Sequence, residues 1–291
     1  MTQVINISAY KFVALKDRDA LRATLRDRCL KLGLKGTILL SPEGINVALS
    51  GTRAPISQII SYFEKSSLLK NMPFKESISD TQPFNRMLVR LKKEVIAFGV
   101  EEIDPQKHTS PHLKPKELHA WLEAGKDIVL LDTRNEYEIK LGTFKNAINP
   151  HIDSFRDFPK AIREMDPALK EKPVVTFCTG GARCEKAAPF LENEGFKEVY
   201  QIDGGILKYF EECGGKFWDG DCFVFDHRVA LDPSLNQTSA KLCFRCREPL
   251  TEEDVKSEDY IIDVSCPYCI HSKKNPDQKH QDRDIRPSTS I

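Results

Sequence analysis

The residues best suited to chemistry lie in one short run from Cys178 to Cys184, with the sequence Cys-Thr-Gly-Gly-Ala-Arg-Cys. The apolar, β-favouring residues 174–177 precede this run, and a helical pattern over 185–191 follows it. Cys178 should therefore lie at the carboxyl end of a buried strand, in a glycine turn that faces a helix amino terminus. Unpaired N–H groups, the positive end of the helix dipole and Arg183 would favour a thiolate over a thiol there. We predict a nucleophilic Cys178, and a buried structural cysteine is the alternative.

A second group of thiols lies near the carboxyl end of the chain. It consists of two Cys-x-x-Cys pairs separated by nineteen residues: Cys243 with Cys246, and Cys266 with Cys269. This spacing suits tetrahedral binding of zinc by four thiolates. The residues between the pairs contain no cofactor motif, and no flavin or haem motif is evident in the chain. We therefore predict a closed, structural zinc site, with two disulfides or free thiols as the alternatives.

The elements that precede the Cys178 loop predict an α+β first domain over residues 1–100. Strand patterns cover 4–13, 36–40, 45–49 and 87–91, and helical patterns cover 17–32 and 54–65. A hairpin signal, Ser-Pro-Glu-Gly at 41–44, joins the two central strands. The resulting βαββαβ order is that of the ferredoxin-like motif.

The Cys178 loop belongs to a second predicted domain, over residues 114–226, which follows a linker at 101–113. Strand patterns at 128–132, 174–177 and 199–202 alternate with helical patterns at 116–123, 135–140, 158–165, 185–191 and 206–212. This alternation predicts a parallel, doubly wound α/β sheet. Ligands bind such sheets beyond the carboxyl ends of the strands, where Cys178 falls. A small cysteine-rich module is expected at 227–272 and a flexible tail at 273–291.

Charge is distributed unevenly along the chain, although the formal net charge is zero. Residues 1–100 carry 16 Lys and Arg against 8 Asp and Glu, whereas residues 101–226 carry 17 against 24. A basic first domain suggests a polyanion partner, and a basic surface that serves only solubility is the alternative. Contacts to RNA phosphates, which would make binding depend on salt, are predicted for five side chains: Arg22, Arg26, Arg90, Lys92 and Lys93.

The composition is that of a globular protein in a reducing compartment. The chain has 291 residues, of which 40% are hydrophobic and 30% are charged. Its nine cysteines are an odd number, and its first residues lack the basic-then-apolar pattern of an export signal. No stretch approaches the roughly 18 consecutive apolar residues of a membrane-spanning helix. We therefore expect a cytoplasmic protein without a membrane partner.

Four separated blocks resemble a rhodanese domain over about residues 115–213. They occur in the family's order, at 130–138, 142–149, 178–184 and 203–205. In rhodaneses the loop cysteine accepts a sulfane sulfur and becomes a persulfide, so the resemblance implies that Cys178 is the nucleophile. It also implies an anion pocket lined by the rest of the loop: Thr179, Gly180, Gly181, Ala182 and Arg183. Asp132 and Arg134 resemble the family's acid and base pair at a strand end, with a role in supporting the loop.

The whole chain, over about residues 1–270, resembles the bacterial tRNA uridine hydroxylases. The resemblance rests on the basic first domain with its Ser-Pro-Glu-Gly-Ile-Asn at 41–46, on the rhodanese-like loop and on the cysteine-rich end. Membership implies oxygen-dependent formation of 5-hydroxyuridine at the wobble position, residue 34, of tRNA, with O2 as co-substrate and an unknown electron or sulfur donor. The first domain also resembles acylphosphatase-like modules in topology. It has no matching phosphatase loop, so that activity is not expected.

Three functions are open for this chain, and two of them use the Cys178 loop. In a hydroxylase, the thiolate could add to C6 of the pyrimidine and make C5 electron-rich enough to react with an oxidant. A sulfurtransferase that carries a persulfide to a small or protein acceptor would use the same residue, and a non-catalytic RNA or protein adaptor is the third possibility. Cys184 could resolve an oxidised Cys178 as a disulfide, or it could simply pack beneath the helix.

Overall fold

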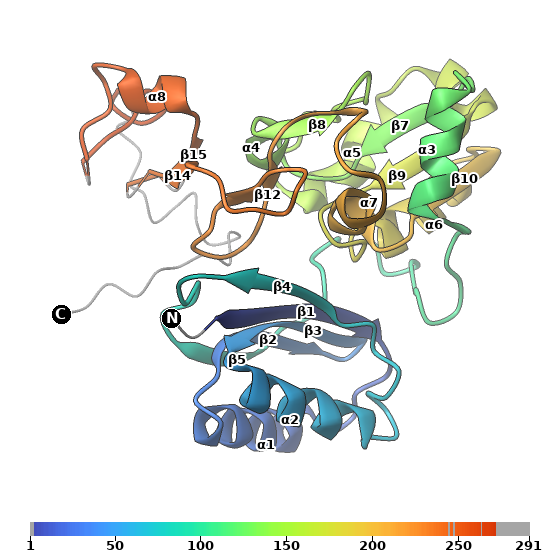
Figure 1. The fold of residues 1–291 in the computed structure, drawn as a ribbon. Coiled ribbons are helices and arrows are strands. Elements are labelled where there is room, and N and C mark those ends of the chain that lie inside the picture. Colours follow the sequence, from blue (N-terminus) through green and yellow to red (C-terminus); the bar gives the residue numbers. More distant parts are fainter. Residues whose placement is uncertain (1–2, 244, 247, 263, 272–291) are drawn as a thin grey trace. The chain divides into compact units, whose positions relative to one another are not determined.

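The computed structural model describes residues 3–243, 245–246, 248–262 and 264–271, and it divides into two compact units (Figure 1). Residues 3–108 belong to the first unit, and the described residues from Thr109 onward belong to the second. The tail predicted at 273–291 lies outside the described residues. No helix within the described ranges is long and apolar enough to cross a membrane.

The first unit is a five-stranded sheet with two helices on one of its faces (Figure 1). Its elements are β1 (Val4–Phe12), α1 (Arg18–Lys31), β2 (Lys35–Ser41), β3 (Gly44–Gly51), α2 (Arg53–Glu64), β4 (Lys75–Ser79) and β5 (Met87–Leu91), and the strand order is β4-β1-β3-β2-β5. The apolar positions of α1 and α2 supply the core against the sheet, with Leu25, Ile59 and Phe63 fully buried. The Asp17 carboxylate caps α1 by accepting a hydrogen bond from the Ala20 N–H, at 3.2 Å.

The predicted βαββαβ order assigned the wrong strand to its last position. β4 pairs antiparallel with β1 and completes the ferredoxin-like motif, whereas β5 is an additional strand that pairs parallel with β2. β4 escaped prediction because its sequence, Lys-Glu-Ser-Ile-Ser, is polar and alternates half-buried with exposed residues. Charged residues are typical of an edge strand, where they discourage pairing with other chains.

The second unit contains the predicted parallel sheet, with helices packed on both of its faces. The sheet strands are β6 (His112–Leu113), β7 (Val129–Asp132), β9 (Pro173–Phe177) and β10 (Glu198–Ile202), in the order β6-β10-β9-β7. The helices are α3 (Pro115–Glu123), α4 (Glu136–Ile139), α5 (Phe158–Arg163), α6 (Cys184–Asn193) and α7 (Gly205–Cys213), and α3 packs with α7 while α5 packs with α6. This arrangement confirms the α/β class. β6 lies within the range predicted as a linker, because two residues pairing with β10 leave almost no strand pattern.

Short paired strands follow α7. β11 (Trp218–Gly220) pairs with β8 (Gly142–Phe144), β12 (Cys222–Phe223) pairs with β13 (Ala230–Leu231), and β14 (Lys241–Leu242) pairs with β15 (Pro249–Leu250), after which comes α8 (Glu252–Lys256). The predicted boundary between residues 226 and 227 falls inside the loop that joins β12 to β13. Strands of two residues carry too little periodicity to reveal such a hairpin from sequence.

Candidate active site and candidate metal site

Cys178 follows directly after β9, which lies between β7 and β10 in the sheet. Residues 178–183 turn the chain from the carboxyl end of β9 into the first turn of α6. The Cys178 side chain is only 2% exposed, and Gly180 and Ala182 are the more exposed residues of the loop. A reagent would therefore approach the Cys178 sulfur past Gly180 and Ala182, whose small size leaves room for it.

The sulfur of Cys178 is surrounded by hydrogen-bond donors. The Gly181 N–H donates to Cys178 Sγ at 3.1 Å. Burial by itself raises the pKa of Cys178, but the Cys184 thiol, the charge of Arg183 and the N–H groups of Arg183 and Gly181 lower it more. The pKa of Cys178 is therefore held well below that of an ordinary thiol, as the sequence predicted from the glycine turn and Arg183. The surroundings of the loop thus favour the thiolate form of Cys178.

Cys184 is the hydrogen-bonding neighbour of that thiolate. It is fully buried at the start of α6, and its Sγ lies 3.7 Å from the Thr133 hydroxyl. Burial and the hydrogen bond to Cys178 both raise the pKa of Cys184 well above its ordinary value. Cys184 therefore remains a thiol and donates to Cys178, a role that fits packing beneath the helix. Resolution of an oxidised Cys178 by Cys184 stays a prediction.

Arg183 is held by a buried carboxylate that sequence reasoning did not single out. Its guanidinium donates two hydrogen bonds to Glu138 of α4, at 2.6 and 2.7 Å, and the Glu138 side chain is fully buried. Burial lowers the pKa of Arg183, but pairing with Glu138 outweighs this and raises it well above the usual value. Glu138 is the third residue of α4 and accepts from the Asn135 N–H, so its capping-box spacing from Asn135 was the available signal.

Asp132 and Arg134, which were predicted to support the Cys178 loop, bond to each other and to β8 rather than to the loop itself. Arg134 pairs with Asp132 through its Nε and one terminal nitrogen, at 2.6 to 3.2 Å, and donates to the Gly142 carbonyl at 2.7 Å. The Thr143 hydroxyl also donates to Asp132, at 2.8 Å. The pair therefore fixes the end of β7 against β8. Between these two residues, the Thr133 hydroxyl donates to the Phe177 carbonyl at 3.0 Å and connects β7 to the strand that carries Cys178.

The amino terminus of α7 holds the other side of the loop. The Ile206 and Leu207 N–H groups donate to the carbonyls of Cys178 and Thr179, at 2.9 and 3.2 Å. Gly205 adopts a φ of +68°, and a Cβ there would lie 2.4 Å from the Cys178 carbonyl oxygen. Only glycine allows this approach, which explains the second glycine of the Gly-Gly block at 204–205. The Thr179 hydroxyl donates to the Phe223 carbonyl at 3.3 Å, so this side chain anchors the loop to β12.

The side chains predicted to bind RNA belong to neighbouring elements of the first unit. Arg22 of α1 is exposed, and its Nε donates to the Val89 carbonyl of β5 at 3.1 Å. Arg26 is exposed one turn further along α1, and Arg90 is half-buried in β5 beside Val89. Half-buried Lys92 and exposed Lys93 follow β5 directly. The structure thus brings Arg22 next to β5, but successive strand residues point to opposite faces, so Arg90 lies on the sheet face opposite the core residue Val89.

The four carboxyl-terminal cysteines lie together in the second unit. Their sulfur atoms all lie within 4.8 Å of one another, with separations of 3.8 Å (Cys243–Cys269), 3.5 Å (Cys246–Cys266) and 3.7 Å (Cys266–Cys269). A tetrahedral zinc site with Zn–S bonds of about 2.3 Å places its sulfurs about 3.8 Å apart. None of the nine cysteines, all of which lie in the described ranges, forms a disulfide. The geometry fits a metal and excludes the alternative of two disulfides in this conformation.

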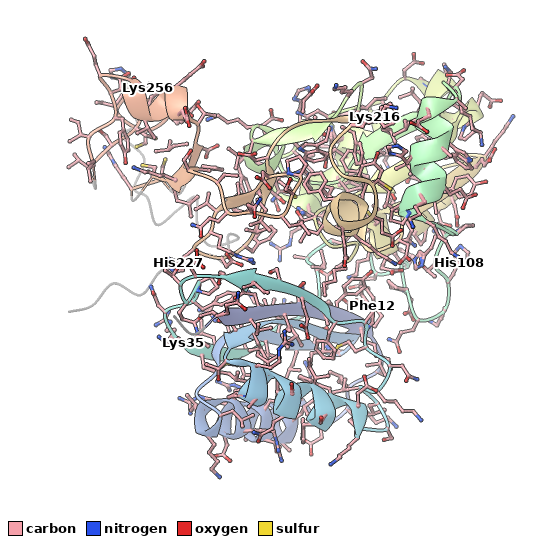
Figure 2. The ribbon with its side chains drawn as sticks, viewed as in Figure 1. Phe12, Lys35, His108, Lys216, His227 and Lys256 are labelled. Atoms are coloured by element: carbon pink, nitrogen blue, oxygen red, sulfur yellow. The ribbon has the colours of Figure 1, made fainter. Side chains whose placement is uncertain are left out.

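The cysteine cluster is connected to α4 through Tyr268, the residue just before Cys269. The Tyr268 hydroxyl donates to Asp254 at 2.6 Å, and Lys140 lies 3.2 Å from the same carboxylate and 3.3 Å from the centre of the Tyr268 ring. Lys140 caps the end of the helix that carries Glu138. Figure 2 labels Lys256, the last residue of the neighbouring α8.

Comparison with known proteins assigns both units. Residues 4–95 match the family model described as "UPF0176 acylphosphatase like domain", and residues 114–212 match "Rhodanese-like domain". The rhodanese-like domain of an Anabaena sp. protein is 20% identical, with a TM-score of 0.32, over 38% of this chain and 80% of that one.

Two relatives that share nearly the full length of this chain carry the same name. The tRNA uridine(34) hydroxylase of Cupriavidus necator is 48% identical over 276 residues, which cover 93% of this chain and 98% of the relative. The protein of the same name from Ralstonia nicotianae is also 48% identical, over 92% of this chain and 96% of the relative. Domain content, the order of the units and this identity lead to one conclusion: the chain belongs to the tRNA uridine(34) hydroxylase family.

Proposed function

We propose that this protein converts uridine 34, the wobble uridine of tRNA, into 5-hydroxyuridine, with Cys178 as the nucleophile. The observation that carries the proposal is the buried Cys178 sulfur, which accepts a hydrogen bond from the Gly181 N–H and has a strongly lowered pKa. The names of the full-length relatives indicate the substrate. A cytoplasmic location is part of the proposal, since tRNA is its substrate.

The chemistry that we propose uses the thiolate to activate the pyrimidine ring. Cys178 Sγ forms a bond to C6, and the electron pair of the C5=C6 bond moves toward C5 and the O4 carbonyl. C5 then bonds to one oxygen atom of O2, and the other oxygen atom leaves as water after uptake of two electrons from an external reductant and three protons. Loss of the C5 proton expels Cys178 as thiolate and restores the double bond. The net reaction consumes uridine, O2, two electrons and two protons, and it yields 5-hydroxyuridine and water.

The loop residues would bind and orient rather than transfer atoms. The donors that lower the pKa of Cys178 also make the thiolate a good leaving group in the last step. Pairing with Glu138 fixes the Arg183 guanidinium in place beside the sulfur. For tRNA binding, we propose phosphate contacts by the basic side chains around α1 and β5, which would weaken as salt rises.

We also propose that the four carboxyl-terminal cysteines hold a structural zinc ion. Sulfur separations of 3.5 to 3.8 Å match a tetrahedral S₄ site. All four coordination positions would be filled by protein sulfur, so the metal would stabilise the fold of the module without touching substrate. Elemental analysis of the purified protein should give about one zinc per chain, and its absence from a folded module would refute this part.

Mass spectrometry of tRNA nucleosides tests the function. Cells that lack this protein should lose 5-hydroxyuridine and nucleosides made from it, and the intact gene should restore them. C178S should not restore them, whereas C213S should, because Cys213 lies at the end of α7 with a raised pKa. Unchanged nucleosides in the deletion strain would overturn hydroxylation. Sulfur transfer from thiosulfate by the purified protein would then favour the sulfurtransferase, and formation of 5-hydroxyuridine without O2 would remove the oxygenation step.

A further inference from the structure

A single exposed phenylalanine lies next to the Cys178 loop. Phe225 is 46% exposed and is the only phenylalanine among the large apolar side chains that are exposed in the described ranges. It lies in the loop between β12 and β13, together with His227, which is labelled in Figure 2. The open side of this aromatic ring is available to stack on a planar ligand.

Two links connect Phe225 to the reactive centre. The Arg183 guanidinium carbon lies 5.8 Å from the centre of the Phe225 ring, and Arg183 is the side chain whose charge lowers the pKa of Cys178. The Phe223 ring meets the Phe225 ring edge-on at 5.1 Å, and the Phe223 carbonyl accepts the hydrogen bond of the Thr179 hydroxyl. Phe225 therefore lies at the margin of the Cys178 loop and contacts the loop's own arginine.

The loop that carries Phe225 is held firmly despite its exposure. The Val224 N–H donates to the Val229 carbonyl at 2.9 Å, and Arg228 pairs with Asp226 at 2.6 Å while both side chains are buried. Val229 adopts a φ of +66°, a conformation that is strained for a β-branched residue. Strain of this kind persists where the surroundings over-determine it, and it concentrates at functional sites. The ring of Phe225 is thus presented on a fixed support.

We propose that Phe225 is the stacking surface for the pyrimidine ring that reacts with Cys178. Attack on C6 requires the base to turn out of its loop and to be held at a fixed tilt to the sulfur, and the described loop residues offer small side chains or groups already engaged in hydrogen bonds. Proteins commonly hold an unstacked base against an aromatic side chain. This inference rests on the proposed function, since it takes the reacting base to be uridine 34.

The first test compares F225L with F225W in hydroxylation of an RNA stem–loop that has uridine at the wobble position. Loss of base stacking corresponds to a roughly 5- to 150-fold rise in KM for F225L, whereas F225W should remain near wild type because it retains a flat π-surface. I262A is the matched control, because Ile262 is 69% exposed in the same unit, and it should leave KM unchanged. An unchanged KM for F225L would overturn the inference.

The second test separates this inference from the proposed function by measuring binding alone. The double variant C178S/F225L should bind the uridine stem–loop more weakly than C178S does. Both variants should bind equally well to a stem–loop in which the wobble base is replaced by an abasic site. Equal binding of the uridine stem–loop would refute the stacking role even in an active hydroxylase. A difference that persists with the abasic RNA would refute it too, because it would place Phe225 against another part of the RNA. Equal rates of Cys178 alkylation in the wild type and in F225L confirm that the loop is intact.

Discussion

Two clusters of cysteine in one chain place sulfur in two different surroundings. At the end of β9 a single sulfur is surrounded by donors that belong to the protein, among them the Gly181 N–H and the Cys184 thiol. Near the carboxyl end four sulfurs face one another at 3.5 to 3.8 Å. Four ionised sulfurs so close together need a cation between them. The first arrangement would keep its sulfur available for reaction, whereas the metal that we propose for the second would engage all four sulfurs.

The largest expected effect is that of metal removal, which should unfold the carboxyl-terminal cysteine cluster and leave the Cys178 loop unchanged. Zinc binding by such sites supplies about 10–16 kcal/mol, so chelation should unfold the module around β14, β15 and α8. Hydrogen exchange should show lost protection there, while the rate of Cys178 alkylation stays within about twofold. C266S should have the same effect as chelation. A module that keeps its protection without zinc would contradict the contrast between the clusters.

The next effect concerns the buried pair that supports the first cluster. E138Q should lower the free energy of unfolding by about 3–5 kcal/mol, because it leaves the Arg183 guanidinium buried without a counter-charge. E136Q is the matched control, since Glu136 lies two residues earlier and its partners, the ring of His151 and the side-chain amide of Asn149, are solvent-exposed contacts. E136Q should lower the free energy of unfolding by only about 0–1 kcal/mol. Urea denaturation measures both, and equal values would show that Glu138 contributes no more than a surface carboxylate.

A third, smaller effect tests whether backbone contact with α7 shapes the Cys178 loop. Gly205 and Gly214, at the two ends of this helix, have φ values of +68° and +66°, so alanine is strained at both. A Cβ at Gly205 would clash with the Cys178 carbonyl, whereas one at Gly214 meets nothing within 4 Å. G205A should therefore lower the free energy of unfolding by about 1–3 kcal/mol more than G214A does. It should also slow alkylation of Cys178. Similar melting temperatures and alkylation rates for the two variants would rule out this constraint.

The two clusters also differ in how far the sequence predicts them. The spacing of the four carboxyl-terminal cysteines predicts their cluster. The strand and helix patterns on either side of Cys178 predict its turn. The side chains that contact Arg183 of the candidate site come from distant segments: Glu138 is 45 residues from Arg183, and Phe225 lies in the loop between β12 and β13. Such contacts depend on tertiary packing, which leaves no periodic signal. The polar strand β4 was missed for the related reason that an edge strand needs little apolar sequence.

The last expected effect concerns the hydrogen bond between Cys178 and Cys184, and it changes a pKa rather than the stability of the fold. The Cys184 thiol donates to the Cys178 thiolate, so C184A should raise the pKa of Cys178 and move its alkylation profile to higher pH. A hydrogen bond to a charged group is worth about 1.5–3 kcal/mol, which corresponds to a shift of roughly 1–2 pH units. C184S retains a donor at the same position and should keep the profile near that of the wild type. Coinciding profiles for C184A and the wild type would show that Cys184 only fills space. Turnover then separates the two roles of Cys184: C184S remains active if the residue only donates, and it fails if a disulfide must form, because serine cannot supply the second sulfur.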